Sequence, residues 1–202
     1  MKKIGITAGA LFVAYGIIRL IDGANGDRGP GLAWSSGHLL FLVGLLLFGV
    51  VLLLARAAIT RRRVLATVAA VVGLVGIAAF VRVILIDLIV GFRAGNHAAM
   101  SVISDDYDRW PGDLGIYPAL QVLGPILFLA GLLTLAVLLT LEHRLTAWAP
   151  PLLILGFVLI SANLDLMPLG GALLGLAFVS AVRPAATVDA VRASGLGNQR
   201  DG

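Results

Sequence analysis

Apolar residues fill six stretches of helical length along the chain, separated by short polar interruptions. A helix needs about 20 mostly apolar residues to cross roughly 30 Å of hydrocarbon. The last two stretches are short and leave room only for a tight hairpin between them. The pattern predicts an all-α, polytopic membrane bundle with six transmembrane helices, at about 4–21, 36–55, 64–92, 118–141, 147–162 and 166–182.

The composition agrees with a membrane protein. Of the 202 residues, 59% are hydrophobic and 13% are charged, about half the charged share of an ordinary soluble domain. The chain has no cysteine, which excludes disulfides, thiolate metal sites and iron–sulfur clusters. The sequence pI of about 10.1 does not indicate nucleic-acid binding, because the basic residues flank the apolar stretches. We expect the lipid bilayer, and no nucleic acid, as a partner.

Basic residues divide unevenly between the two sides that six spans define. The side with both termini carries ten of the fifteen Lys and Arg residues. These ten are Lys2, Lys3, Arg56, Arg61, Arg62, Arg63, Arg144, Arg183, Arg192 and Arg200. The opposite side has five arginines and eight of the eleven acidic residues. The positive-inside rule therefore predicts that both termini are cytoplasmic, and the Ala, Gly, Val, Leu and Arg-rich usage favours a bacterial inner membrane.

The two ends of the chain and its one large loop complete the predicted organisation. Lys2 and Lys3 precede an apolar stretch, but no clear A-x-A cleavage site follows, so we interpret 4–21 as an uncleaved first span. We expect a single membrane domain over 1–183 and a flexible cytoplasmic tail over 184–202. The outer loop 93–117 is long enough for a short interfacial helix at about 94–104.

Polar residues recur at one depth in the predicted bundle. A rise of about 1.5 Å per residue, counted from the cytoplasmic end of each span, places them near the outer leaflet. They are Arg19, Asp22, His38, Arg82, Asp87, Gln121, Asn163 and Asp165. In one interpretation these groups reach the interface or pair with one another and fix the helix packing. In the other they line a cavity open to the outside that holds a polar or anionic ligand.

Arg82 and Asp87 interrupt the most apolar part of the third span. They lie five residues apart, about 140° around a helix, so they cannot form a local pair. Each then needs a partner on another element. We expect Arg82 to meet Asp22 or Asp165, and Asp87 to meet Arg19, Arg28 or Arg93.

Two weaker patterns resemble metal sites. The stretch DDYDRWPGD supplies Asp105, Asp106, Asp108 and Asp113, but its spacing lacks the glycine and distal glutamate of a calcium-binding EF-hand loop. An acidic outer loop is the simpler interpretation. His38 and His97 both fall near the outer face, but no third ligand stands at a fixed spacing. We therefore predict no metal and no cofactor.

Small residues within the spans favour close helix packing. Gly5 and Gly9, and again Gly171 and Gly175, form G-x-x-x-G patterns that let two helix backbones approach. The contacts could lie within the chain or across a homodimer. Six helices must pack somewhere, so we favour contacts within the chain; the oligomeric state stays open.

No sequence pattern indicates a specific reaction. The chain contains no H-E-x-x-H, G-x-S-x-G, P-loop or G-x-G-x-x-G pattern, which disfavours an enzyme. Two hypotheses remain. In the first, which we favour from sequence, the protein is a non-enzymatic accessory or assembly component that contacts a protein partner through its outer loops. In the second it is a small transporter, or a lipid- or solute-binding protein, with an outward-facing polar cavity. The first predicts that the polar groups are paired and the cavity closed, and the second predicts an open cavity lined by them.

Overall fold

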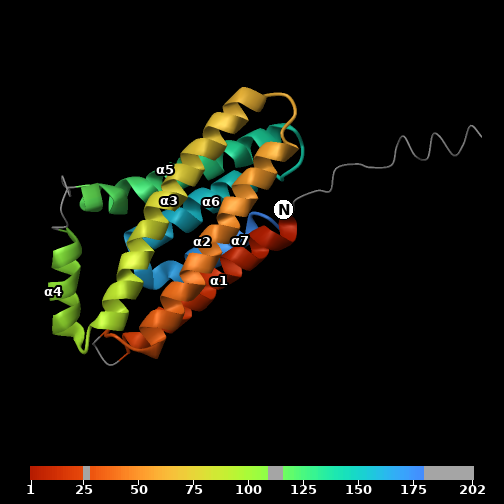
Figure 1. Ribbon diagram of the computed structural model, residues 1–202. Coiled ribbons are helices and arrows are strands. Elements are labelled where there is room, and N and C mark those ends of the chain that lie inside the picture. Colours follow the sequence, from red (N-terminus) through yellow and green to blue (C-terminus); the bar gives the residue numbers. More distant parts are fainter. Residues whose placement is uncertain (25–27, 109–115, 180–202) are drawn as a thin grey trace, which may run out of the picture.

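The computed structural model describes residues 1–24, 28–108 and 116–179. Within these ranges the chain is helical and forms no strand (Figure 1). The helices are α1 (Lys2–Asp22), α2 (Leu32–Ala58), α3 (Arg63–Arg93), α4 (His97–Asp108), α5 (Ile116–Leu141), α6 (Ala149–Ala162), η1 (Leu164–Leu166, a 3-10 turn) and α7 (Met167–Leu176). The predicted all-α class is confirmed; the predicted tail at 184–202 lies outside the described residues.

Four helices, α1, α2, α3 and α5, are long and apolar enough to cross a membrane. Their outward faces are apolar as well. On α2, exposed side chains recur every three or four residues along one stripe: Leu39, Val43, Leu46, Val50 and Leu53. The opposite stripe is buried in the core, so only the environment outside the bundle can cover the exposed one. This is the surface of a membrane-embedded protein.

Six spans are not confirmed. The segments predicted at 147–162 and 166–182 are helical, but α6 has 14 residues and α7 has 10, about 21 and 15 Å. Neither covers a bilayer of ordinary thickness by itself. The two helices form a hairpin whose turn is η1, and the hairpin packs against α5 and α1.

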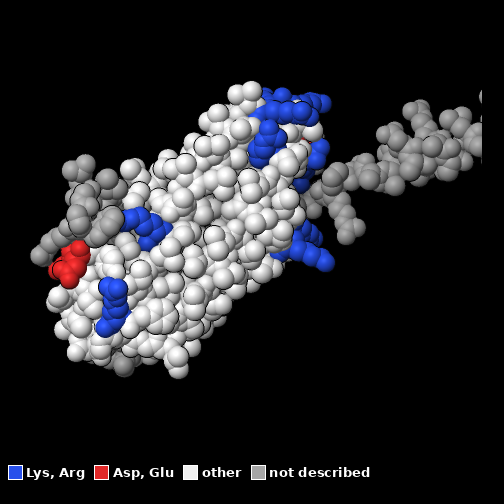
Figure 2. Space-filling view, viewed as in Figure 1, with Lys and Arg blue, Asp and Glu red and all other residues white. Residues whose placement is uncertain are grey.

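Consecutive long helices run antiparallel, so the bundle has two ends. One end holds the α2–α3 and α5–α6 connections and is called here the Glu142 end. The other holds the α1–α2 connection and the hairpin turn and is called the Asp165 end. Lys and Arg gather at the Glu142 end in the face shown, whereas the acidic surface lies over α4 near the opposite end (Figure 2). The flank between them is mostly uncharged.

Glycines set the closest helix contacts. A Cβ on Gly9 would lie 2.5 Å from the Cα atom of Gly175, so α1 and α7 touch through their backbones. On the same interface, a Cβ on Gly16 would lie 2.5 Å from the Cδ atom of Pro168. Gly73 and Gly131 bring α3 and α5 together in the same way. The predicted packing of the G-x-x-x-G patterns within the chain is therefore confirmed.

Helix α4 folds back along the last turns of α3. With 31 residues, α3 is about 46 Å long and exceeds the thickness of the hydrocarbon. Its last part buries Val83, Ile86 and Val90 against Met100 of α4. A short helix in the loop 93–117 is confirmed, three residues later than predicted at its start; its location at the membrane interface stays a prediction.

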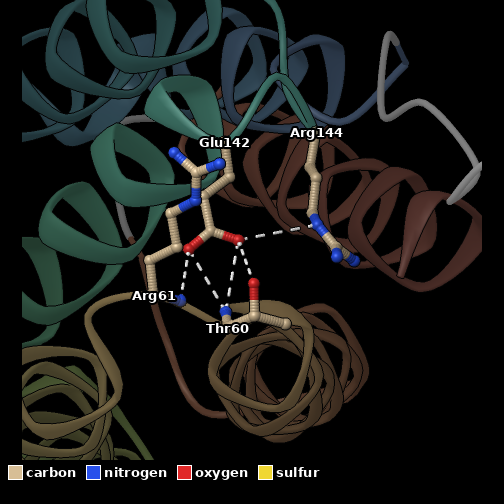
Figure 3. Close-up of polar contacts among 4 residues, drawn as sticks. All are labelled: Thr60, Arg61, Glu142 and Arg144. Atoms are coloured by element: carbon tan, nitrogen blue, oxygen red, sulfur yellow. Dashed lines mark hydrogen bonds and ion pairs between the residues drawn. The ribbon is translucent and has the colours of Figure 1, made fainter.

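At the Glu142 end, the side-chain carboxylate of Glu142 connects two loops of the bundle. Glu142 accepts the backbone N–H groups of Thr60 and Arg61, at 3.2 and 3.0 Å, and the Thr60 hydroxyl at 3.2 Å (Figure 3). The Nε atom of Arg144 lies 3.7 Å from the same carboxylate. These contacts connect the α5–α6 turn to the α2–α3 turn, and the Arg61 N–H bond is the main reason that the pKa of Glu142 is lowered.

Candidate functional site

A cavity of about 540 Å³ lies among α1, α2, α3, α5 and the α6–η1 hairpin arm. This volume is within the range of sites that hold drug-sized molecules. Aromatic rings make up much of its wall: Phe12, Tyr15, Phe41, Phe80, Phe128 and Phe157. The cavity is thus a feature of the bundle interior that the apolar sequence pattern does not reveal.

Polar groups occupy one end of this cavity. Phe80 and Asp87 both line it and lie seven residues apart on α3, which corresponds to about 10 Å along the helix. Gln121 and Phe128 have the same separation on α5. In both helices the polar residue is the one nearer the Asp165 end. The cavity is therefore amphipathic, with an aromatic body and a polar head region.

The cavity opens between α5 and the α6–η1 segment. Its back wall is made by side chains of α1, α2 and α3 that are at most 8% exposed: Phe12, Tyr15, His38, Phe41, Val83 and Ile84. By contrast, Val122, Ile126 and Leu164 line the front and are 44% to 61% exposed. Gln121 and Ser161 are exposed beside them and line the cavity too. The opening therefore lies on the outer surface of the bundle and has a mostly apolar rim with two polar residues.

His38 and Asp87 form the polar pair of the cavity. The Nδ1 atom of His38 lies 2.8 Å from the carbonyl oxygen of Trp34, which can only accept, so Nδ1 carries a hydrogen. The Nε2 atom lies 3.8 Å from Oδ2 of Asp87. That separation is too long for a direct hydrogen bond, and both residues line the cavity. A donor on a third group could reach both atoms from the cavity side, because both residues line the cavity.

Trp34 fixes this pair on both sides. Its indole N–H donates to the backbone carbonyl of Asp87 at 2.9 Å, and its ring lies 4.3 Å from that of His38. Gly91 allows the close approach, since a Cβ at that position would overlap the indole ring. The tryptophan therefore connects the start of α2 to α3 at the level of Asp87.

A second polar cluster lies at the same end of the bundle but is closed. Asp165 contacts Nη2 of Arg28 at 2.7 Å and Nε of Arg19 at 3.4 Å. The backbone N–H of Asp165 donates to the Asn163 side chain at 2.8 Å, which caps the η1 turn. The space beside Arg19 and Arg28 is only about 10 Å³, enough for about one water molecule.

The predicted polar layer is therefore divided between two sites. His38, Asp87 and Gln121 line the cavity, whereas Arg19, Asn163 and Asp165 belong to the closed cluster. Asp22 borders the small space beside that cluster. Arg82 is partly buried and lines neither space.

The predicted partners of Asp87 were wrong, and the predicted contact of Arg82 with Asp22 stays a prediction. Asp87 faces His38 instead of an arginine, and Arg93, one of its predicted partners, donates to the Tyr107 hydroxyl at 3.2 Å. Asp165 pairs with Arg19 and Arg28 instead of Arg82. The reason is the angle of each residue around its helix, which depth counting does not give.

The weaker metal candidates acquire no further support. Within the described ranges, no group of three or more histidine or acidic side chains is placed to hold a metal ion. Asp105 and Asp106 are exposed on α4, and Asp113 lies outside the described residues. His97 contacts the Arg28 carbonyl oxygen at 2.6 Å, so the two outer histidines have separate partners.

Sequence reasoning missed most of the cavity wall and one member of the closed cluster. Arg28 was expected as a partner of Asp87, but it contacts Asp165 instead. The aromatic residues carried no signal because a phenylalanine in an apolar run can face lipid, core or cavity. No family model matches the chain, and no curated protein or solved structure is detectably similar to it.

Proposed function

We propose that this protein binds a small, largely apolar molecule inside the membrane and admits it from the lipid through the opening between α5 and the α6–η1 segment. The observation that carries the proposal is the amphipathic cavity of about 540 Å³. An aromatic body suits an apolar ligand, and a few polar groups at one end suit its head. Binding is the step that a small transporter and a solute-binding membrane protein share.

The arrangement of polar groups favours this over the accessory role. An accessory protein was expected to have all its outer polar groups paired and the space between them closed. Asp165 and its two arginines fit that expectation. The cavity beside His38 and Asp87 does not, because it is large and lined by both residues. A contact with a protein partner through the loops stays a prediction of the sequence.

The finer topology is part of the proposal. The α6–η1–α7 hairpin would complete a six-helix arrangement by a local thinning of the bilayer. The Glu142 end, which collects the basic side chains, would face the cytoplasm of a bacterial cell. Because the chain has no cysteine, Ala147→Cys and Ala98→Cys each introduce one exposed thiol, at opposite ends. In intact cells an impermeant maleimide should label only the second; labelling of only the first would reverse the orientation.

Binding is tested with N-phenyl-1-naphthylamine, a neutral apolar dye that fluoresces when it leaves water. Purified protein in detergent is titrated with the dye, and so are two variants of α5. Ile126→Trp adds bulk at the opening, whereas Val137→Trp adds it to an exposed position on the same helix that does not line the cavity. We expect saturable binding that Ile126→Trp weakens about tenfold and Val137→Trp leaves unchanged, with a tenfold change equal to about 1.4 kcal/mol.

The proposal fails if dye binding is unsaturable in the unaltered protein. It also fails if both tryptophan variants bind the dye as the unaltered protein does. Thermal unfolding of each variant shows whether a loss of binding reflects a loss of folding.

A further inference from the structure

The charged residue that lines the cavity is acidic. Among its described lining residues Asp87 is the charged one, and no lysine or arginine lines it. Arg19 and Arg28 lie beside the cavity, because they line the neighbouring small space together with Tyr15 and His38, but their guanidinium groups contact Asp165. A phosphate or carboxylate head in the cavity would therefore meet the Asp87 carboxylate directly, whereas the charges of the neighbouring Arg19 and Arg28 are already shared with Asp165. A positive head would meet a partner.

The two facing atoms of the polar pair, His38 Nε2 and Asp87 Oδ2, are both acceptors. Because Nδ1 of His38 donates to the Trp34 carbonyl, Nε2 of the neutral imidazole is an acceptor. It stands 3.8 Å from Oδ2 of Asp87, another acceptor. A group that contacts both acceptors from the cavity must donate to both. An ammonium head has two or more N–H donors on one atom and meets this requirement, whereas a hydroxyl has one.

A proline adds a third acceptor to the same wall. Pro125 lies inside α5 and lines the cavity with Gln121, four residues earlier. Since proline has no N–H, the Gln121 carbonyl lacks its usual helical donor. The Gln121 side chain brings an amide to the same region, with an oxygen that accepts and an NH2 group that donates. A donor-rich head gains from the two oxygens of Gln121, the backbone carbonyl and the side-chain amide oxygen.

The aromatic rings next to the polar pair suit the same charge. Tyr15 stacks on Phe41 with ring centres 4.8 Å apart, and Phe80 meets Phe41 edge-on at 5.4 Å. All three line the cavity. The face of an aromatic ring attracts a cation, most strongly where water is excluded. One acid beside several aromatic walls is thus an arrangement that selects organic cations.

From these observations we infer that the ligand of the cavity is a lipophilic organic cation, with Asp87 as the counter-ion and His38 as a second acceptor. The inference rests on the proposed binding function and adds the charge of the ligand to it. A protonated amine uses both acceptors, and a quaternary cation uses the carboxylate and the aromatic rings.

The test compares two ions of nearly the same shape and opposite charge. Tetraphenylphosphonium and tetraphenylborate each compete with bound N-phenyl-1-naphthylamine in the purified, full-length protein. We expect the cation to displace the dye at a concentration at least about tenfold lower than the anion, since a charge pair in a partly dehydrated site is worth at least that factor. The thermal unfolding midpoint with each ion, measured without the dye, gives an independent comparison.

Two matched variants assign the preference to one carboxylate. Asp87→Asn removes the charge from the cavity, whereas Asp22→Asn removes an equal charge at the same end, outside the cavity lining. We expect Asp87→Asn to abolish the preference for the cation and Asp22→Asn to retain it. Equal displacement by both ions in the unaltered protein would overturn the inference while leaving the binding function intact. A preference for the cation that Asp87→Asn leaves unchanged would overturn it too.

Discussion

Asp165 and Asp87 are two carboxylates at the same end of one bundle, and they differ in what surrounds them. Their side chains are similarly exposed, 37% and 31%. Asp165 is in contact with two guanidinium groups beside a space of about 10 Å³. Asp87 faces one imidazole, beyond hydrogen-bond distance, beside a cavity of about 540 Å³. The Asp165 carboxylate is thus paired with arginines of the protein, whereas the Asp87 carboxylate lines the cavity.

The positions of the two residues in the fold explain the contrast. Asp165 lies on the η1 turn, where the long side chains of Arg19 and Arg28 reach it from α1 and from the connection after α1. Asp87 lies within the long helix α3, and its short side chain extends toward α2. The η1 turn brings Asp165 within reach of two arginines, whereas Asp87 on the side of α3 faces the cavity.

The largest effect expected from this contrast is on stability. Asp165→Ala leaves Arg19 and Arg28, 18% and 33% exposed, without their shared carboxylate. Because the cluster is partly buried, we expect a loss of about 1–3 kcal/mol, between the values for surface and buried pairs. Asp87→Asn should change the stability of the ligand-free protein by less than about 0.5 kcal/mol. Chemical or thermal unfolding in detergent measures both.

Asp106→Ala, on the exposed face of α4, controls for the loss of any acidic group. Should Asp87→Asn prove as damaging as Asp165→Ala, the distinction between a matched and an unmatched carboxylate would be wrong. The cavity would then be a structural feature stabilised by its own ion pair.

A smaller effect is expected from the residue that aligns Asp87. Trp34→Phe removes the N–H bond to the Asp87 carbonyl, at 2.9 Å, and loosens the contact with His38. We expect a loss of about 1 kcal/mol, the usual value of one such bond. Dye affinity should fall severalfold as well, because the polar pair loses its fixed position. Ser36→Ala, two residues later and exposed, is the control and should change neither quantity.

Helix positions were readily predicted from the sequence, but the partner of each polar residue was not. The predicted span at 64–92 and the observed α3 at Arg63–Arg93 agree because hydropathy marks where an apolar run begins and ends. Depth counting also placed Arg19 and Asp165 in one layer, and they are in contact. It failed for Asp87 because a partner depends on helix rotation and on which helices pack together. Both are set by distant residues such as Gly73 and Gly131.

The cavity was not predictable for a different reason. Its wall is made of residues such as Phe12 and Phe128, whose apolar character is the same whether they face lipid, another helix or an empty space. An apolar run in the sequence shows that its residues avoid water, but it does not show whether they contact lipid, another helix or a cavity. The feature of the sequence that comes closest to indicating a cavity is the short apolar stretch at 147–162, which forms the 14-residue helix α6.

Glu142 extends the comparison to a third carboxylate, at the other end of the bundle, and has the smallest expected effect. Its pKa is lowered from an ordinary value of 4.5, first by the Arg61 N–H bond and then by the Thr60 contacts. A group whose pKa is lowered on folding adds stability above its unfolded pKa and loses it as the pH falls through the folded one. Glu142→Gln should therefore lower the unfolding midpoint near neutral pH.

The sign of this effect sets its pH dependence. The difference in unfolding midpoint between the unaltered protein and Glu142→Gln should shrink as the pH falls from about 6 to 3, where the carboxylate becomes protonated in both states. The other acidic groups titrate alike in the two proteins, so the difference isolates Glu142. A difference that stays constant over this range would mean that the neutral glutamic acid joins the two turns equally well. Like Asp165 and unlike Asp87, Glu142 would then matter for the contacts that it makes within the protein.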